Sequence, residues 1–206
     1  MTYANPTPGR RKVETPKGAA IFMVLAVVLL WVLEAIDTVL LGALDKLGIH
    51  AQEPMGWVGI FFAPFLHAGF GHLIANSLPL LVLGFLILVG RGGALRFFWS
   101  TIVSVVASGI AAWILTPAHH VVVGASGVVF GWLTYLMARG FFARDIRSIA
   151  ISILVFLVYG SVLFGVFPTQ AGVSWQAHLG GAIGGVFAAW VMHRRATRKF
   201  ETVSGL

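Results

Sequence analysis

The chain has 206 residues, of which 58% are hydrophobic and only 10% are charged. Soluble domains are roughly 45–50% apolar and about 25% charged. This composition, with a mean hydropathy of +0.92, therefore excludes a soluble enzyme and predicts a protein that crosses the membrane several times. The formal net charge is +7 and the chain has no cysteine, which excludes disulfides and thiolate chemistry.

The N-terminal segment, residues 1–18, contains Pro6, Pro8 and Pro16 and few apolar side chains. This pattern predicts a flexible cytoplasmic arm. Six apolar stretches follow, each long enough to cross a hydrocarbon core of about 30 Å; we place them at residues 19–44, 72–89, 95–115, 125–142, 148–164 and 173–192. The predicted fold class is an all-α polytopic membrane protein with six transmembrane helices, a membrane domain at residues 19–193 and a basic cytoplasmic tail at residues 194–206.

The basic residues predict how the chain is oriented in the membrane. Thirteen of the 14 lysines and arginines lie before the first stretch, between the second and third, around the end of the fourth, or after the sixth. With six spans these segments share one side, and the positive-inside rule makes that side the cytoplasm. We expect an integral protein of a bacterial plasma membrane with both termini in the cytoplasm. The positive charge then reflects topology, and no nucleic-acid partner is expected.

The first stretch carries two carboxylates, Glu34 and Asp37, spaced i, i+3 and therefore on one helix face. Charged groups at membrane depth are costly and need a function. Two interpretations are open: the carboxylates face the interior of the bundle and hold loops by hydrogen bonds, or they form part of a proton or ion pathway.

The second stretch opens with polar residues near the outer membrane surface. His72 and Asn76 are spaced i, i+4 and share a helix face, and His67 comes just before the helix. We expect His72 and Asn76 to form a hydrogen-bonding patch that needs a partner. His119 and His120 fall in a later outer loop and are expected to be solvated, because a metal site would need more ligands.

The fourth stretch opens with Gly124-Ala125-Ser126-Gly127. A serine beside glycines in a membrane helix is most often a close-packing feature. Ser126, however, falls at a helix N-terminus, where free backbone N–H groups and the helix dipole favour an oxyanion. The pattern differs from the nucleophile elbow of soluble hydrolases, because Val128 stands at the position of the last glycine.

The sixth stretch places His178 about one helical turn inside the outer surface, at the depth predicted for Ser126. The fourth and sixth helices would both run inward and therefore lie parallel. Each also carries a GxxxG pair that allows close backbone approach, namely Gly127 with Gly131 and Gly181 with Gly185. Tight packing of these helices would bring Ser126 to His178.

Together these motifs resemble the rhomboid family of intramembrane serine proteases. The resemblance rests on His67-x4-His72-x3-Asn76, Gly124-Ala125-Ser126-Gly127, and His178 followed by Gly181-x3-Gly185, in the second, fourth and sixth of six spans. It implies a rhomboid-like fold and a catalytic dyad without a carboxylate, in which Ser126 is the nucleophile and His178 the base. It also implies an oxyanion hole made of His72, Asn76 and the Ser126 N–H. Phe130 takes a position that is often tyrosine in the family and packs on the catalytic histidine; phenylalanine keeps the ring and lacks the hydroxyl.

The implied activity is hydrolysis of peptide bonds in or near the transmembrane segments of single-pass or polytopic membrane proteins, at a site facing outside. No cofactor and no metal are expected. One alternative is a rhomboid-like pseudoprotease that binds membrane proteins without cutting them. Another is a small proton-coupled transporter using Glu34, Asp37, His72 and His178. No catalytic pair is expected to depend on the fifth stretch.

Overall fold

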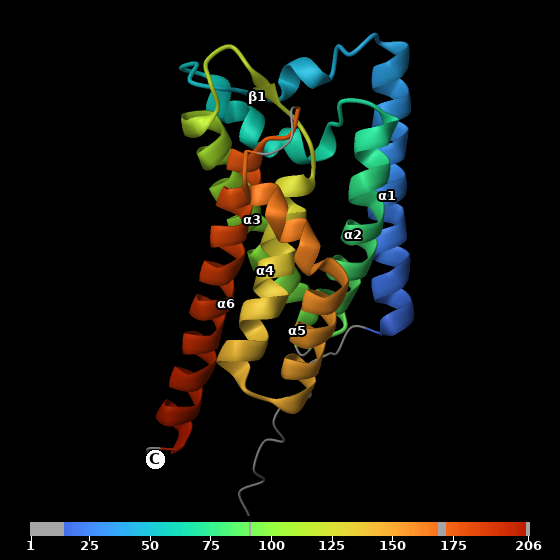
Figure 1. Cartoon of the computed structure of the whole chain (residues 1–206). Coiled ribbons are helices and arrows are strands. Elements are labelled where there is room, and N and C mark those ends of the chain that lie inside the picture. The colour runs from blue at the N-terminus through green and yellow to red at the C-terminus, as the bar shows by residue number, and fades with distance from the viewer. Residues whose placement is uncertain (1–14, 91, 169–171, 205–206) are drawn as a thin grey trace, which may run out of the picture.

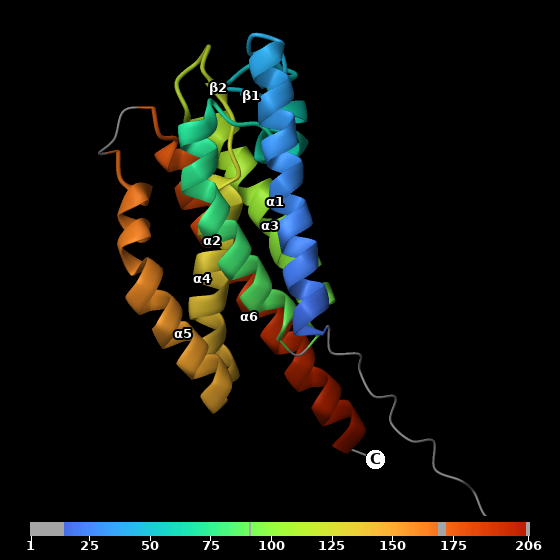
Figure 2. The ribbon, with the colours of Figure 1, turned by 90° about the vertical axis from the view of Figure 1, so that its right-hand side faces the viewer.

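The computed structural model describes residues 15–90, 92–168 and 172–204, with side chains described as far as Arg194. Within this part of the chain the long elements are α1 (Pro16–Val39), α2 (Phe70–Leu88), α3 (Gly93–Leu115), α4 (Ser126–Ala143), α5 (Ile146–Tyr159) and α6 (Trp175–Ser204). The helices run roughly along one direction, and α4 lies at the centre, in contact with α2, α3, α5 and α6 (Figure 1). α1 contacts α2 at the edge of the bundle, and α5 lies on the opposite side (Figure 2).

Two helix boundaries differ from the prediction. α1 ends at Val39 and not near residue 44, because Leu41 and Gly42 take positive φ angles of 55° and 77° that no α-helix can include. α6 runs past residue 192 to Ser204 and takes in most of the predicted C-terminal tail, since no glycine or proline interrupts residues 186–204. The predicted N-terminal arm lies mostly outside the described residues, and its last residues begin α1.

The protein is an integral membrane protein. Four helical segments of the described chain are long and apolar enough to cross a bilayer: α1, α2, α3 and the continuous segment Ile146–Val166, which joins α5 to the 3₁₀ helix η4 (Gly160–Val166). α4 and α6 are not among them. α4 is surrounded by other helices, so it needs less apolar surface than a helix in contact with lipid. The count of six spans remains a prediction.

A small sheet at the end of the bundle where α4 begins was not predicted. Strands β1 (Ile49–His50) and β2 (Val121–Val122) pair antiparallel, with Ile49 opposite Val122 and His50 opposite Val121. β1 belongs to the loop after α1, which also holds the 3₁₀ helices η1 (Asp45–Leu47), η2 (Gly56–Phe61) and η3 (Ala63–Phe65). The pairing ties this loop between α1 and α2 to the segment that leads into α4.

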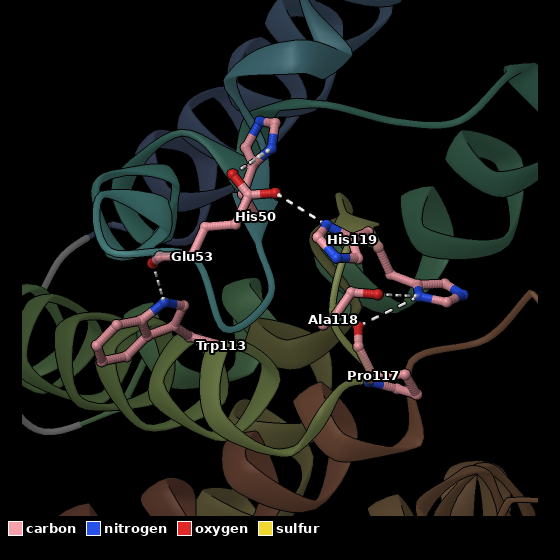
Figure 3. Close-up of polar contacts among 7 residues, drawn as sticks. His50, Glu53, Trp113, Pro117, Ala118 and His119 are labelled. Atoms are coloured by element: carbon pink, nitrogen blue, oxygen red, sulfur yellow. Dashed lines mark hydrogen bonds and ion pairs between the residues drawn. The ribbon is translucent and has the colours of Figure 1, made fainter.

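Further contacts hold the loop between α1 and α2 against the end of α3. The carbonyl oxygen of Glu53 accepts a hydrogen bond of 2.9 Å from the indole N–H of Trp113, and the Glu53 carboxylate lies 3.9 Å from His119 (Figure 3). The His119 side chain is 90% exposed, as expected for a solvated loop histidine. Among the described residues, no group of three His, Asp or Glu side chains could hold a metal ion.

The two carboxylates of α1 face the interior and are 5% and 6% exposed. Oδ1 of Asp37 accepts a hydrogen bond of 2.6 Å from the backbone N–H of Leu44, which supports the loop-holding interpretation for this residue. Burial, together with the negative charges of Asp37 and Glu34, raises the pKa of Asp45 in the loop to about 6.

Candidate active site

α4 and α6 pack backbone against backbone through two pairs of glycines. A methyl group added to Gly181 would overlap the carbonyl oxygen of Gly127, and one added to Gly185 would overlap that of Gly131. Small residues permit such an approach, and the close contact supplies van der Waals attraction where lipid offers no hydrophobic driving force. The structure therefore brings together the four glycines that the sequence analysis paired.

α6 has a second glycine face, which the sequence analysis missed. A Cβ atom on Gly180 would lie 2.5 Å from the carbonyl oxygen of Ala107, and one on Gly184 would lie 2.8 Å from the Ala107 Cβ, both on α3. A signal was available in the sequence, because each glycine of the pair has a glycine directly before it. Two adjacent glycines repeated four residues later give a helix two small faces. α6 is thus held tightly by both α3 and α4.

Ser126 is the first residue of α4, directly after the N-cap residue Ala125. Its side chain is half-buried, and within the described part of the chain its hydroxyl has no hydrogen-bond partner. The first N–H groups of a helix lack partners inside the helix and lie at the positive end of its dipole. A hydroxyl and free backbone donors therefore meet at the start of α4.

His178 is buried, with 7% of its surface exposed, and two contacts hold its ring. The ring stacks on Phe130 with centroids 4.0 Å apart and planes 10° from parallel. Its Nδ1 lies 2.9 Å from the carbonyl oxygen of Gly165. Among the described residues no hydrogen bond joins His178 to Ser126, so their pairing remains a prediction. Catalytic hydrogen bonds are often long in unliganded sites and shorten in the substrate complex.

His72 and Asn76 share one face of α2, at the same end of the bundle. A Cβ atom on Gly124 would lie 2.5 Å from Cε1 and 2.8 Å from Nε2 of His72, so the imidazole sits against the segment that leads to Ser126. Gly124 also has a φ of +126°, which side-chain-bearing residues rarely adopt. The amide of Asn76 donates a hydrogen bond of 3.1 Å to the His72 carbonyl. Its second N–H stays available to another acceptor.

His67 lies beneath this patch and is 2% exposed. Its ring meets the His72 ring edge-on at 5.2 Å between centroids. Neither ring nitrogen of His67 has a hydrogen-bond partner among the described residues. Burial, and secondarily the charge of His72, lowers the pKa of His67 to about 4.

The low pKa of His67 makes the fold sensitive to acid. The unfolded chain binds this proton near pH 6.5 and the folded chain only near 4, so stability rises with pH across this window and falls as the pH is lowered through it. The full difference corresponds to about 3 kcal/mol. We expect His67→Phe, which keeps a ring against His72, to lose less thermal stability than the wild type between pH 7 and pH 5 in detergent.

His119→Phe is the matched control, because it makes the same substitution at a histidine whose side chain is 90% exposed. Equal slopes of melting temperature against pH in the wild type and in His67→Phe would contradict the assignment of this proton to His67.

The fold and the site together define a polytopic helical membrane protein with a serine and a histidine on two glycine-packed helices. The chain belongs to the rhomboid family: the rhomboid domain matches residues 54–195, which contain α2 to α5 and most of α6.

Similar proteins include several that are uncharacterized. One from Mycobacterium tuberculosis is 42% identical over 176 residues, covering 81% of this chain and 72% of that protein. One from Mycobacterium leprae is 42% identical over 185 residues, covering 84% of this chain and 72% of that protein. The rhomboid protease GluP of Bacillus subtilis is 30% identical over 128 residues, which cover 60% of this chain and 24% of GluP.

The Gly165 carbonyl is the site contact that the sequence analysis missed. Gly165 lies in η4, the continuation of α5. The predicted fifth stretch ends at residue 164, and Gly165 follows it directly, so the His178 ring is held from the end of this helical segment. The expectation that no catalytic pair depends on the fifth stretch stays a prediction. Every residue has a backbone carbonyl, so residue type does not predict which one accepts this hydrogen bond. The one available sequence signal was that residue 165 is a glycine.

Proposed function

We propose that the protein is an intramembrane serine protease that uses Ser126 and His178. The observation that carries the proposal is the glycine packing of α4 on α6, which sets the helix that begins with Ser126 beside the helix that carries His178. Membership of the rhomboid family and similarity to the rhomboid protease GluP support the same activity.

In this reaction His178 accepts and returns protons through one ring nitrogen, Nε2. Ser126 Oγ attacks the carbonyl carbon of the scissile peptide bond, and Nε2 of His178 accepts the hydroxyl proton. His178 then gives this proton to the leaving amine as the C–N bond breaks. Water next attacks the acyl-enzyme ester and passes its proton to His178, which returns it to Ser126 Oγ. The product is a free acid, and no cofactor takes part.

The negative charge that develops on the substrate oxygen needs donors. The backbone N–H of Ser126 lies at the positive end of α4. The Asn76 amide and the His72 imidazole belong to the face of α2 next to Gly124. We assign these three groups to the oxyanion hole, with His67, Gly124, Gly127, Phe130, Gly181 and Gly185 in supporting positions.

The substrates are the transmembrane segments of other membrane proteins, which reach the site from the bilayer. Six helices cross the membrane in this proposal, and the distribution of lysine and arginine puts both termini in the cytoplasm. The site then faces outside, where water can enter.

Labelling by a serine-directed fluorophosphonate tests the proposal. The purified wild type in detergent should react, and Ser126→Ala should not, because the nucleophilic hydroxyl is lost. Ser100→Ala is the matched control and should keep full labelling, since the Ser100 hydroxyl donates a hydrogen bond within its own helix, to the Phe97 carbonyl. An unlabelled wild type that binds membrane proteins without cutting them would indicate a pseudoprotease. Undiminished labelling of Ser126→Ala would refute the role of Ser126.

A further inference from the structure

We propose that the backbone carbonyl of Gly165 is a positioning group for His178, in the role that a carboxylate has in a Ser-His-Asp triad. The inference rests on the proposed function and adds to it the group that selects which ring nitrogen faces the serine. It also assigns a part in the site to η4, the segment that continues α5.

The hydrogen bond determines where the proton of the neutral ring resides. The Gly165 oxygen lies 2.9 Å from His178 Nδ1, and a carbonyl oxygen can only accept a hydrogen bond. Nδ1 must therefore carry the proton, which leaves the lone pair on Nε2 free to accept the proton of a serine hydroxyl. In the opposite tautomer Nε2 would carry the proton and could not act as a base.

The Gly165 carbonyl is available because of its place in η4. The last carbonyls of a helix have no partner within it and need a hydrogen-bond donor from elsewhere. Gly165 is the next-to-last residue of this 3₁₀ helix, whose end is marked by the hydrogen bond from Phe167 N–H to the Phe164 carbonyl. The imidazole N–H of His178 donates its hydrogen bond to this carbonyl.

Phe130 and Gly165 act on different degrees of freedom of the same ring. The stacked Phe130 ring, 4.0 Å away, sets the plane of the imidazole. The Gly165 carbonyl selects between the two ring orientations that share this plane and differ by a half-turn of the ring about Cβ–Cγ, because Nδ1 faces the carbonyl in only one of them. Since phenylalanine has no hydroxyl to offer a hydrogen bond, this role falls to the backbone.

The absence of a side chain at Gly165 allows this close contact. A Cβ atom there would lie 2.8 Å from Phe130 Cζ and 3.2 Å from His178 Nδ1. Both distances are shorter than ordinary van der Waals contact. A methyl group must therefore push the carbonyl, the imidazole or the Phe130 ring out of place. At Gly160, at the start of the same 3₁₀ helix, the three atoms nearest to an added Cβ all belong to the Phe156 ring, the first at 3.2 Å.

Nitrogen NMR of protein labelled with ¹⁵N-histidine measures the tautomer directly. The protein is kept in detergent at about pH 8, where an imidazole is neutral, and the His178 signals are identified by their loss in His178→Gln. We expect Nδ1 to be protonated and Nε2 unprotonated in the wild type. A wild-type ring protonated at Nε2 would overturn the proposal without any variant being made.

The glycine variants supply the second readout. In Gly165→Ala we expect the second tautomer to appear and fluorophosphonate labelling of Ser126 to slow about 10²-fold, the cost of a misplacement of about 1 Å. Gly160→Ala should match the wild type in both measurements. Unchanged tautomer and labelling in Gly165→Ala would overturn the proposal. The tautomer signal does not depend on activity, so an unlabelled wild type that still shows protonated Nδ1 would refute the proposed protease function alone.

Discussion

Replacing Ser126 with alanine is expected to lower the cleavage of a model transmembrane substrate by about 10⁴-fold or more, because the attacking oxygen is lost. His178→Ala should cost about as much, since the hydroxyl proton then has no acceptor. Both variants should still insert. Ser126→Ala should keep its melting temperature within a few degrees, because the Ser126 hydroxyl has no partner among the described residues. His178→Ala should lose some stability, because it removes the ring that stacks on Phe130 and hydrogen-bonds to the Gly165 carbonyl. The measurements are the cleavage rate in proteoliposomes and thermal unfolding in detergent.

The double variant tests whether the two residues act as a unit. If they do, Ser126→Ala combined with His178→Ala should be no slower than either single variant. Asn76→Ala and His72→Ala are the comparison variants. Their cleavage rate should fall by only roughly 10–10³-fold, because the Ser126 N–H remains as a donor to the oxyanion. Cleavage near the wild-type rate in Ser126→Ala would refute the dyad.

Gly181→Val is expected to lose most activity and some stability together, although Gly181 provides no catalytic atom. Even a methyl group there would overlap the Gly127 carbonyl, so valine must push α6 away from α4. Overpacking of this kind costs about 1–3 kcal/mol. Transfer of the serine proton needs a separation of about 2.6–3.2 Å, and a shift of about 1 Å can slow a reaction 10²-fold. Cleavage rate and thermal unfolding are measured on the same preparation.

Gly160→Val is the control for this substitution. The atoms nearest to a Cβ at Gly160 belong to the Phe156 ring, 3.2 Å away on the same helical segment, and this ring can move. We expect a small loss of activity here, although η4 as a whole does contribute to the site through Gly165. Equal losses at Gly160 and Gly181 would show that the packing of α4 on α6 does not control the geometry of the dyad.

Much of the candidate site was predictable because its spacings lie within single helices. His72 and Asn76 share a face of α2 through their i, i+4 spacing alone, and the glycines at residues 127, 131, 181 and 185 indicated which helices approach closely. The ring at Phe130 was expected against His178 by resemblance, and the structure places it there. The contact between Gly180 and α3 was not predicted. The adjacent glycines give α6 two small faces of the same composition, and composition does not say which helix packs on each face.

The amino-acid sequence by itself determined the membrane-protein class, the positions of the long helices apart from the far end of α6, and the residue types at the site, since these follow from composition and from periodicity along one chain. Only the tertiary structure decided the pairing of β1 with β2 and the hydrogen bond from His178 to the Gly165 carbonyl. Every residue has the same carbonyl group. Which one meets the histidine depends on where η4 ends in space, and no spacing within a single helix specifies that position.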